Sequence, residues 1–290
     1  MTRPPLPETE ATDTPLDYAL AKGEVWRDTS DDRSTLDMVR NALERSDILL
    51  AFQPVIRVID TRPAFHEGLV RLLDDRGRII PAAQFMPVVE SLELGRELDV
   101  AALRCGLGAL SRTPDLRLSI NMSARSIGYS RWVQVLHDWL ARDETVGERL
   151  ILEITESSAM LVPELVRVFM SELQDKGITF ALDDFGAGQT CFRYLRDFYF
   201  DILKVDGSFV RGCDTNPDNQ CILNALVMIG QQFDMFTVAE AVENAAEARF
   251  LARAGFDCLQ GFHYGAPQVR PNWFDRDLTD GRSGKVGRTG

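Results

Sequence analysis

Short apolar runs alternate with stretches of helical periodicity along most of this chain, from residue 49 to residue 259. A short apolar run is typical of a buried strand, whereas apolar residues at every third or fourth position are typical of an amphipathic helix. The runs predict eight strands, at 49–58, 65–73, 116–122, 149–155, 178–183, 202–205, 235–239 and 256–259. Helices are predicted at 32–46, 85–110, 130–141, 163–176, 191–198, 219–233 and 244–254.

This alternation restricts the fold to the α/β class, because strands that are joined through helices form βαβ units and a parallel sheet. A barrel of eight such units needs about 250 residues, which fits a chain of 290. The nearest match to a dinucleotide-binding glycine pattern, Gly106-Leu107-Gly108, lies in a predicted helix and lacks the third glycine. The sequence therefore predicts an α/β fold of the TIM (β/α)8 barrel type. We expect it to occupy residues 34–275, between a flexible lead-in at 1–33 and a flexible tail at 276–290.

The charge balance argues against several classes of partner. The chain carries 44 Asp and Glu against 32 Lys and Arg, a formal net charge of −12, so we expect no binding of duplex DNA or RNA. No apolar run reaches the length of roughly 18 residues that a transmembrane helix needs, so we expect no membrane insertion. The five cysteines form no CxxC pair, which disfavours zinc ligation and predicts a reducing, cytoplasmic compartment.

Polar side chains stand at or near the carboxyl ends of seven successive predicted strands. In a barrel those ends meet at one rim, where active sites are built. A single acid at a strand end is usually a helix cap or a solvated residue, but five carboxylates at one rim repel one another. Divalent cations would relieve that repulsion, since Mg²⁺, Mn²⁺ and Ca²⁺ prefer oxygen ligands. The residues are Glu67, Asn121, Glu153, Asp183 with Asp184, Lys204, Glu240 and Gln260.

The acidic doublet Asp183-Asp184 is unusual, because neighbouring side chains of a regular strand point to opposite faces. We interpret it as the place where the strand stops alternating, since Gly186 and Gly188 follow and begin a loop. Two divalent cations about 4 Å apart at such a rim can hold a phosphodiester for in-line attack. Lys204, among the acids, can steady a phosphate or take part in proton transfer. The residues by themselves indicate a metal-assisted phosphodiesterase.

The motifs around these residues resemble those of the EAL domain family, phosphodiesterases of the bacterial messenger cyclic di-GMP. The resemblance covers roughly residues 35–270 and implies a modified TIM barrel whose first strand runs antiparallel to the others. Its motifs follow one another in the family's order. They are Phe52-Gln53-Pro54-Val55, His66-Glu67-Gly68-Leu69-Val70-Arg71 in place of E-A-L-x-R, Asn121-Met122-Ser123, Glu153-Ile154-Thr155-Glu156, Asp183-Asp184-Phe185-Gly186-Ala187-Gly188, Leu203-Lys204-Val205-Asp206, Ala239-Glu240-Ala241-Val242-Glu243 and Gln260-Gly261-Phe262.

The resemblance also implies a role for each matching residue. The first metal would be held by Glu67, Asn121, Glu153 and Asp183, and the second would lie among Asp183, Asp184 and Glu240. Glu67, Lys204 and Glu240 are the predicted catalytic residues, with Lys204 assisting the attacking water. Gln53, Arg71 and Gln260 are predicted to contact the nucleotide. Glu156 and Glu243 are predicted to support the loop at 185–191, which links metal binding to the formation of a homodimer in the family.

The chain departs from the family pattern at three places. Gly68 replaces an alanine, Ala241 replaces a glycine, and Gln189-Thr190-Cys191 replaces an aromatic-Ser-Ser sequence. Residue 68 is expected to point away from Glu67, because it is the next residue along a strand. The change at residues 189–191 is expected to affect how the loop closes and how metal binding is coupled to dimer formation.

The leading hypothesis is hydrolysis of cyclic di-GMP to linear pGpG with two divalent cations, Mg²⁺ or Mn²⁺, with Ca²⁺ as an inhibitor. One alternative is a non-catalytic receptor that binds cyclic di-GMP and signals through a partner. Such a receptor is disfavoured because every expected ligand is present. A second alternative is a scaffold that uses the barrel surface for protein contacts. The sequence identifies neither the controlling signal nor a regulatory protein.

Overall fold

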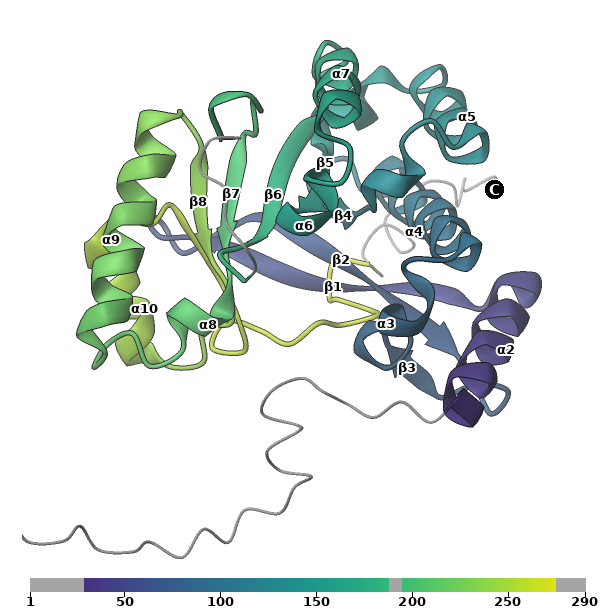
Figure 1. Cartoon of the computed structure of the whole chain (residues 1–290), viewed down its shortest axis with the longest axis horizontal. Coiled ribbons are helices and arrows are strands. Elements are labelled where there is room, and N and C mark those ends of the chain that lie inside the picture. Colours follow the sequence, from purple (N-terminus) through teal and green to yellow (C-terminus); the bar gives the residue numbers. More distant parts are fainter. Residues whose placement is uncertain (1–28, 188–194, 275–290) are drawn as a thin grey trace, which may run out of the picture.

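The computed structural model describes residues 29–187 and 195–274 (Figure 1). Three parts of the chain lie outside these ranges: residues 1–28, 188–194 and 275–290. They include most of the predicted lead-in, the departure from the family pattern at 189–191 and the predicted tail.

Eight strands close into a barrel. They are β1 (Ile48–Arg57), β2 (Pro63–Leu73), β4 (Leu118–Asn121), β5 (Leu150–Thr155), β6 (Thr179–Phe185), β7 (Ile202–Val205), β8 (Phe236–Ala239) and β9 (Cys258–Gln260). β1 pairs antiparallel with both β2 and β9, and the neighbours from β2 through β4 to β9 are parallel. The predicted barrel and its antiparallel first strand are therefore confirmed.

Helices cover the outside of this barrel. The α-helices are α2 (Thr29–Arg45), α3 (Met86–Val89), α4 (Glu93–Arg112), α5 (Ser130–Leu140), α6 (Glu156–Ala159), α7 (Pro163–Gln174), α8 (Gly207–Val210), α9 (Pro217–Gln232) and α10 (Ala245–Ala254). Short 3-10 helices lie at Ala82–Gln84, Ala124–Ser126 and Glu144–Arg149. None of the helices in the described ranges is long and apolar enough to span a membrane.

Several elements differ from the prediction, including the short helices α6 and α8, which the sequence did not predict. A further short strand, β3 (Ile79–Pro81), pairs antiparallel with the far end of β2. The helix predicted at 85–110 is split into α3 and α4 by a turn at residues 90–92. The first half of the helix predicted at 191–198 lies outside the described ranges, and from residue 195 the backbone forms only a brief 3-10 segment.

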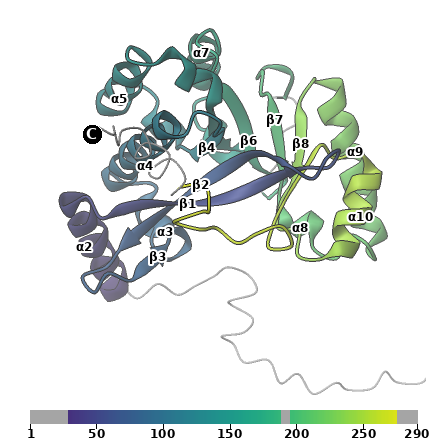
Figure 2. The ribbon, with the colours of Figure 1, turned by 180° about the vertical axis from the view of Figure 1, so that it is seen from behind.

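Side-chain alternation along the strands builds two apolar layers. Outward-facing residues such as Leu118, Leu152 and Leu203 pack under the helices. Inward-facing residues from seven strands form a plug at one end of the barrel: Val55, Phe65, Ile151, Ala181, Ile202, Val238 and Cys258. β1 and β2 extend past the barrel toward α2, as Figure 2 shows from behind. Val39, Leu72 and Phe85 belong to a separate apolar cluster on that side.

Candidate functional site

A layer of polar side chains lies above the apolar plug, and each of the eight barrel strands supplies one member. The layer consists of Gln53, Glu67, Asn121, Glu153, Asp183, Lys204, Glu240 and Gln260. Seven of these lie within a strand and Glu240 directly follows β8. Six are buried, and only Asn121 and Glu240 are partly exposed. The structure therefore brings together seven of the eight residues that the sequence places at strand ends, with Gln53 as the eighth member of the layer, while Asp184 lies outside the layer and is exposed.

Lys204 lies at the centre of this layer and is fully buried. Its Nζ is 2.7 Å from Glu153 Oε2, 2.7 Å from Glu240 Oε1, 2.8 Å from Asp183 Oδ1 and 3.2 Å from Glu67 Oε2. Burial alone would lower the pKa of Lys204, but the four carboxylates together raise that pKa well above its usual value. The four carboxylates therefore favour the protonated form of Lys204, which lies within 3.2 Å of all four.

Glu67 is the most extensively hydrogen-bonded of these acids. Asn121 Nδ2 donates to its Oε1 at 2.8 Å, and Gln260 Nε2 donates to its Oε2 at 2.7 Å. Burial works to raise the pKa of Glu67, yet Lys204 and these two amides outweigh burial and lower that pKa. Glu67 is thus held ionised and in a fixed orientation.

The predicted nucleotide-contacting residues divide into two groups. Gln53 and Gln260 belong to the layer: Gln260 Nε2 donates to Gln53 Oε1 at 3.2 Å, and Gln53 Nε2 donates to the carbonyl of Gly265 at 3.0 Å. Arg71 lies four residues beyond Glu67 on β2 and is only half-buried. Burial lowers the pKa of Arg71, while the Glu67 carboxylate partly offsets that effect. Its guanidinium donates to the carbonyl of Val70 at 2.8 Å.

The acidic doublet is explained by a bulge in β6. Asp183 and Asp184 together face a single residue of β7, because the ladder shifts between Leu182 and Phe185. Asp184 adopts a left-handed backbone conformation, with φ of +54°, which Asp tolerates better than most residues. The expectation that the strand ends at residue 183 is wrong, since β6 continues to Phe185. The bulge lets both carboxylates reach the same rim.

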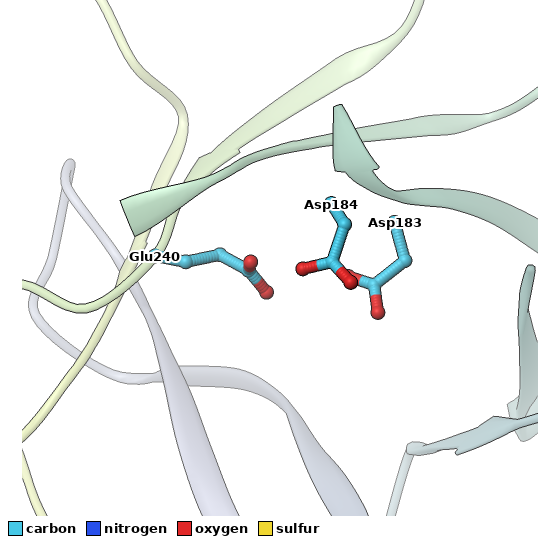
Figure 3. Close-up of side chains that lie close together, drawn as sticks. All are labelled: Asp183, Asp184 and Glu240. Carbon is cyan, nitrogen blue, oxygen red and sulfur yellow. The ribbon is translucent and has the colours of Figure 1, made fainter. Parts of the chain in front are cut away.

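Asp183, Asp184 and Glu240 form a compact acidic trio (Figure 3). Each offers a carboxylate oxygen, and these oxygens lie within 4.8 Å of one another. Burial, and then the charge of Asp183, raise the pKa of Asp184 to about 6. Burial also raises the pKa of Glu240 well above its usual range. Carboxylates that lie this close resist ionising together unless a cation joins them.

The acidic residues fit a divalent cation. Glu153 Oε1 is buried and accepts no hydrogen bond from any described residue, although a buried carboxylate oxygen normally has a partner. Burial and the nearby Glu67 raise the pKa of Glu153 well above its usual value. Five carboxylates therefore face one lysine, and their oxygens are the ligands that Mg²⁺ and Mn²⁺ prefer.

The two residues predicted to support the loop after β6 differ in their surroundings. Glu156 is buried, and its Oε2 accepts a hydrogen bond from the Gly186 backbone at 3.3 Å, at the start of that loop. Glu243 is exposed and forms an ion pair with Arg211, with Oε1 3.4 Å from Nε. Among the residues that the structure describes, Glu156 alone of the two contacts the loop.

Two cavities flank the polar layer. One, of about 380 Å³, is lined by Glu67, Glu240, Gln260, Arg211 and the exposed ring of Phe262. The other, of about 440 Å³, lies between β2, α3 and α4 and is lined by Asn121, Met86 and Asp99 among others.

Asp99 on α4 is a candidate that the sequence analysis missed. It is buried beside the larger cavity, and its Oδ2 accepts hydrogen bonds from Ser126 Oγ at 2.6 Å and from the Ser123 backbone at 3.0 Å. Burial raises the pKa of Asp99 to about 7. The sequence could have indicated Asp99, because it lies on the apolar face of a predicted helix and Asp is rarely buried without a polar partner.

Two departures from the family pattern lie beside this site. Gly68 points outward: a Cβ built there would lie 3.1 Å from Leu50 Cδ1 and 3.2 Å from the Ser119 carbonyl oxygen. Ala241 has a φ of +52°, where a glycine would be less strained. The methyl group of Ala241 also leaves room only for a glycine at position 207, because a Cβ built on Gly207 would lie 2.6 Å from Ala241 Cβ.

Comparisons with known proteins agree with this architecture. The family model described as EAL domain matches residues 36–267. The signaling protein YkoW of Bacillus subtilis is 30% identical over 247 residues, which cover 84% of this chain and 31% of YkoW. The cyclic di-GMP phosphodiesterase PdeF of Escherichia coli is 28% identical over 246 residues, which cover 83% of this chain and 33% of PdeF. The chain thus spans about a third of the length of these relatives.

A solved structure of the MucR phosphodiesterase in complex with c-di-GMP has the same fold. MucR of Pseudomonas aeruginosa is a bifunctional diguanylate cyclase and cyclic di-GMP phosphodiesterase. That structure superposes with a TM-score of 0.73 at 30% identity, over 81% of this chain and 97% of the solved one.

Proposed function

Because the chain belongs to the EAL domain family, we propose that it hydrolyses cyclic di-GMP to linear pGpG with the help of two divalent cations. The observation that carries the proposal is the polar layer itself, in which four carboxylates surround Lys204 at the mouth of a closed barrel. Similarity to the PdeF and MucR phosphodiesterases supports the choice of substrate.

The chain's own residues prepare the site in two ways. The charge of Lys204 and the hydrogen bonds from Gln260 and Asn121 lower the pKa of Glu67 against its burial, and the two amides fix its orientation, so its carboxylate is preorganised. Lys204 stays protonated and donates hydrogen bonds, so it can orient a water molecule or a phosphate oxygen. When bound, Mg²⁺ or Mn²⁺ would supply Lewis acidity to the phosphate and a nucleophilic water.

The two cavities are consistent in their arrangement with the shape of the proposed substrate. Cyclic di-GMP carries two guanines, one on each side of its phosphodiester ring, and the polar layer has one cavity on each side. In the larger cavity, both hydrogen bonds to Asp99 use Oδ2. Oδ1 can therefore accept a hydrogen bond from the donor edge of a guanine. In the smaller cavity, the exposed Phe262 ring offers a stacking surface.

The remaining finer assignments are proposals that rest on the family resemblance, on composition and cysteine pattern, or on the coordination chemistry of the cations. They are the individual roles of the residues in the polar layer, the identity of the cations as Mg²⁺ or Mn²⁺, inhibition by Ca²⁺, a homodimer, the domain limits at 34–275 and a cytoplasmic location.

Chromatography of cyclic di-GMP after incubation with the purified chain and Mn²⁺ tests the proposal. We expect pGpG to accumulate with the wild-type chain but not with Glu67→Gln, which keeps the shape of the side chain and removes its charge. Glu148→Gln changes an exposed acid outside the layer and is the matched control. Binding of cyclic di-GMP without turnover by the wild-type chain would instead support a receptor.

A further inference from the structure

A third cavity, of about 340 Å³, lies on the outer wall of the barrel. It is bounded by β1, by α4 and by residues Val269 to Phe274, which follow the point where Gln268 pairs with Phe52. Its strand wall includes Leu50 and Phe52, on the face of β1 opposite to Gln53. Figure 1 shows α4 beside β1 on that side of the molecule. The cavity is therefore separate from the polar layer.

The floor of this cavity is apolar and aromatic. Phe52 is 4% exposed, and its ring centroid lies 6.2 Å from that of the partly buried Phe274. Gly108 on α4 leaves the opposite wall without a side chain. A Cβ built there would meet only the two terminal guanidinium nitrogens of Arg112, at 3.3 and 3.9 Å. A flat ring can thus enter beside Gly108 and pack on the partly exposed Phe274, with the buried Phe52, whose ring centroid lies 5.0 Å from that of Trp273, behind it.

Three arginines line the same cavity. Arg104 and Arg112 project from one face of α4, and Arg270 belongs to the C-terminal stretch. None of the three forms an ion pair with a carboxylate in the described ranges, although the chain carries a net charge of −12. The Arg112 guanidinium carbon lies 5.8 Å from the centroid of the Phe274 ring. Among the residues that the structure describes, the cavity therefore joins an aromatic floor to three arginines that form no ion pair.

We propose that this cavity binds a phosphate monoester that carries an aromatic ring. Three guanidinium groups match a phosphate dianion better than a carboxylate monoanion, and their planar N–H groups fit its oxygens. The ring would pack against Phe274, beside the Arg112 guanidinium, with Phe52 beneath as part of the apolar floor. The volume of about 340 Å³ falls at the small end of the range for small-molecule sites.

Phenyl phosphate is the probe that tests this site. Calorimetric titration of the whole chain in EDTA, which keeps cations away from the acidic layer, should show saturable binding. Arg112→Gln removes one charge, and Gly108→Met fills the space beside the floor while improving helix propensity. Each variant should weaken phenyl phosphate binding by at least tenfold without lowering the melting temperature.

Two controls separate this site from the rest of the molecule. Arg249→Gln changes an exposed arginine of α10 and should bind phenyl phosphate like the wild-type chain. Glu67→Gln, in the polar layer, should also bind it normally, so failure of the proposed catalysis leaves this site standing. Absence of saturable binding, or equal affinity in Gly108→Met and wild type, would overturn the proposal. Equal affinity for inorganic phosphate and phenyl phosphate would overturn the role of the aromatic floor.

Discussion

Lys204 Nζ lies 2.7 Å from Glu153 Oε2 at the centre of the barrel, where both side chains are 1% exposed or less. Three further carboxylates reach the same ammonium group. Lys204 therefore supplies the positive charge that holds this acidic layer together when no cation is bound. Its removal should make the fold depend on added cations.

Lys204→Met keeps most of the side-chain volume and removes the charge. In EDTA we expect a loss of about 3 kcal/mol or more in the free energy of unfolding, because four carboxylates, three of them buried, lose their partner. Mn²⁺ should restore much more stability to this variant than it adds to the wild-type chain. Urea unfolding with and without Mn²⁺ measures both effects. Lys176→Met, at an exposed position, is the control, and equal stability of the two variants would refute this role of Lys204.

Asp184→Asn tests the acidic trio of Asp183, Asp184 and Glu240. The amide keeps the size of the side chain but removes one anionic oxygen from the group, so activation by Mn²⁺ should require at least tenfold more cation.

Ca²⁺ should bind the wild-type chain yet support little turnover, because its larger and looser shell positions water poorly. Titration of Mg²⁺, Mn²⁺ and Ca²⁺ into metal-free protein, followed by the rate of pGpG formation, checks both points. An unchanged Mn²⁺ requirement in Asp184→Asn would exclude Asp184 from the cation site.

Gly68→Ala restores the residue that the family has next to the glutamate. The added methyl group points at Leu50 and at the Ser119 carbonyl, away from the polar layer, so turnover should change by less than about tenfold. Crowding at 3.1–3.2 Å should cost at most about 2 kcal/mol of the free energy of unfolding. Gly106→Ala, whose Cβ would lie 2.0 Å from Ile120 Cδ1, should be more destabilising. If Gly68→Ala changed the rate of turnover by more than about tenfold while the free energy of unfolding stayed within the expected range, this glycine would serve catalysis.

Asp99 should make stability depend on pH. Its pKa of about 7 in the folded chain exceeds the value near 3.9 of an unfolded chain. Between these values the folded state holds a proton that the unfolded state has released, so stability falls as pH rises. Relative to Asp99→Asn, the wild-type chain should lose up to about 1.4 kcal/mol per pH unit between roughly pH 5 and 7.

Urea unfolding of both proteins at several pH values measures this difference. Asp115→Asn, at an exposed loop position, should show no such trend against the wild-type chain. A pH-independent difference between the wild-type chain and Asp99→Asn would show that Asp99 keeps an ordinary pKa.

Much of the fold follows from local patterns. The apolar runs place all eight barrel strands because each buries at least one face, and their order predicts the barrel. β3 was not predicted, because Ile79–Pro81 is three residues long and ends in a proline. The break between α3 and α4 was not predicted either, since apolar residues continue through the turn around Leu92. The antiparallel direction of β1 came from the family resemblance and not from periodicity.

The site was predictable as a set of residues but not as a geometry. Strand ends identify Glu67, Glu153 and Lys204, yet the contacts of Lys204 reach residues 51 and 137 positions away, which no local pattern encodes. The bulge that turns Asp183 and Asp184 to one rim depends on pairing with β7. Asp99 was missed because its partners, Ser123 and Ser126, lie 24 and 27 residues along the chain.

The most direct test of the proposed function is a single comparison of rates. The purified chain is incubated with cyclic di-GMP in Mn²⁺ or in EDTA, and pGpG is quantified by chromatography. We predict sustained formation of pGpG in Mn²⁺, none above the uncatalysed rate in EDTA, and recovery of the rate when Mn²⁺ is returned in excess. Equal rates in Mn²⁺ and EDTA, or no pGpG from folded protein in Mn²⁺, would contradict the account.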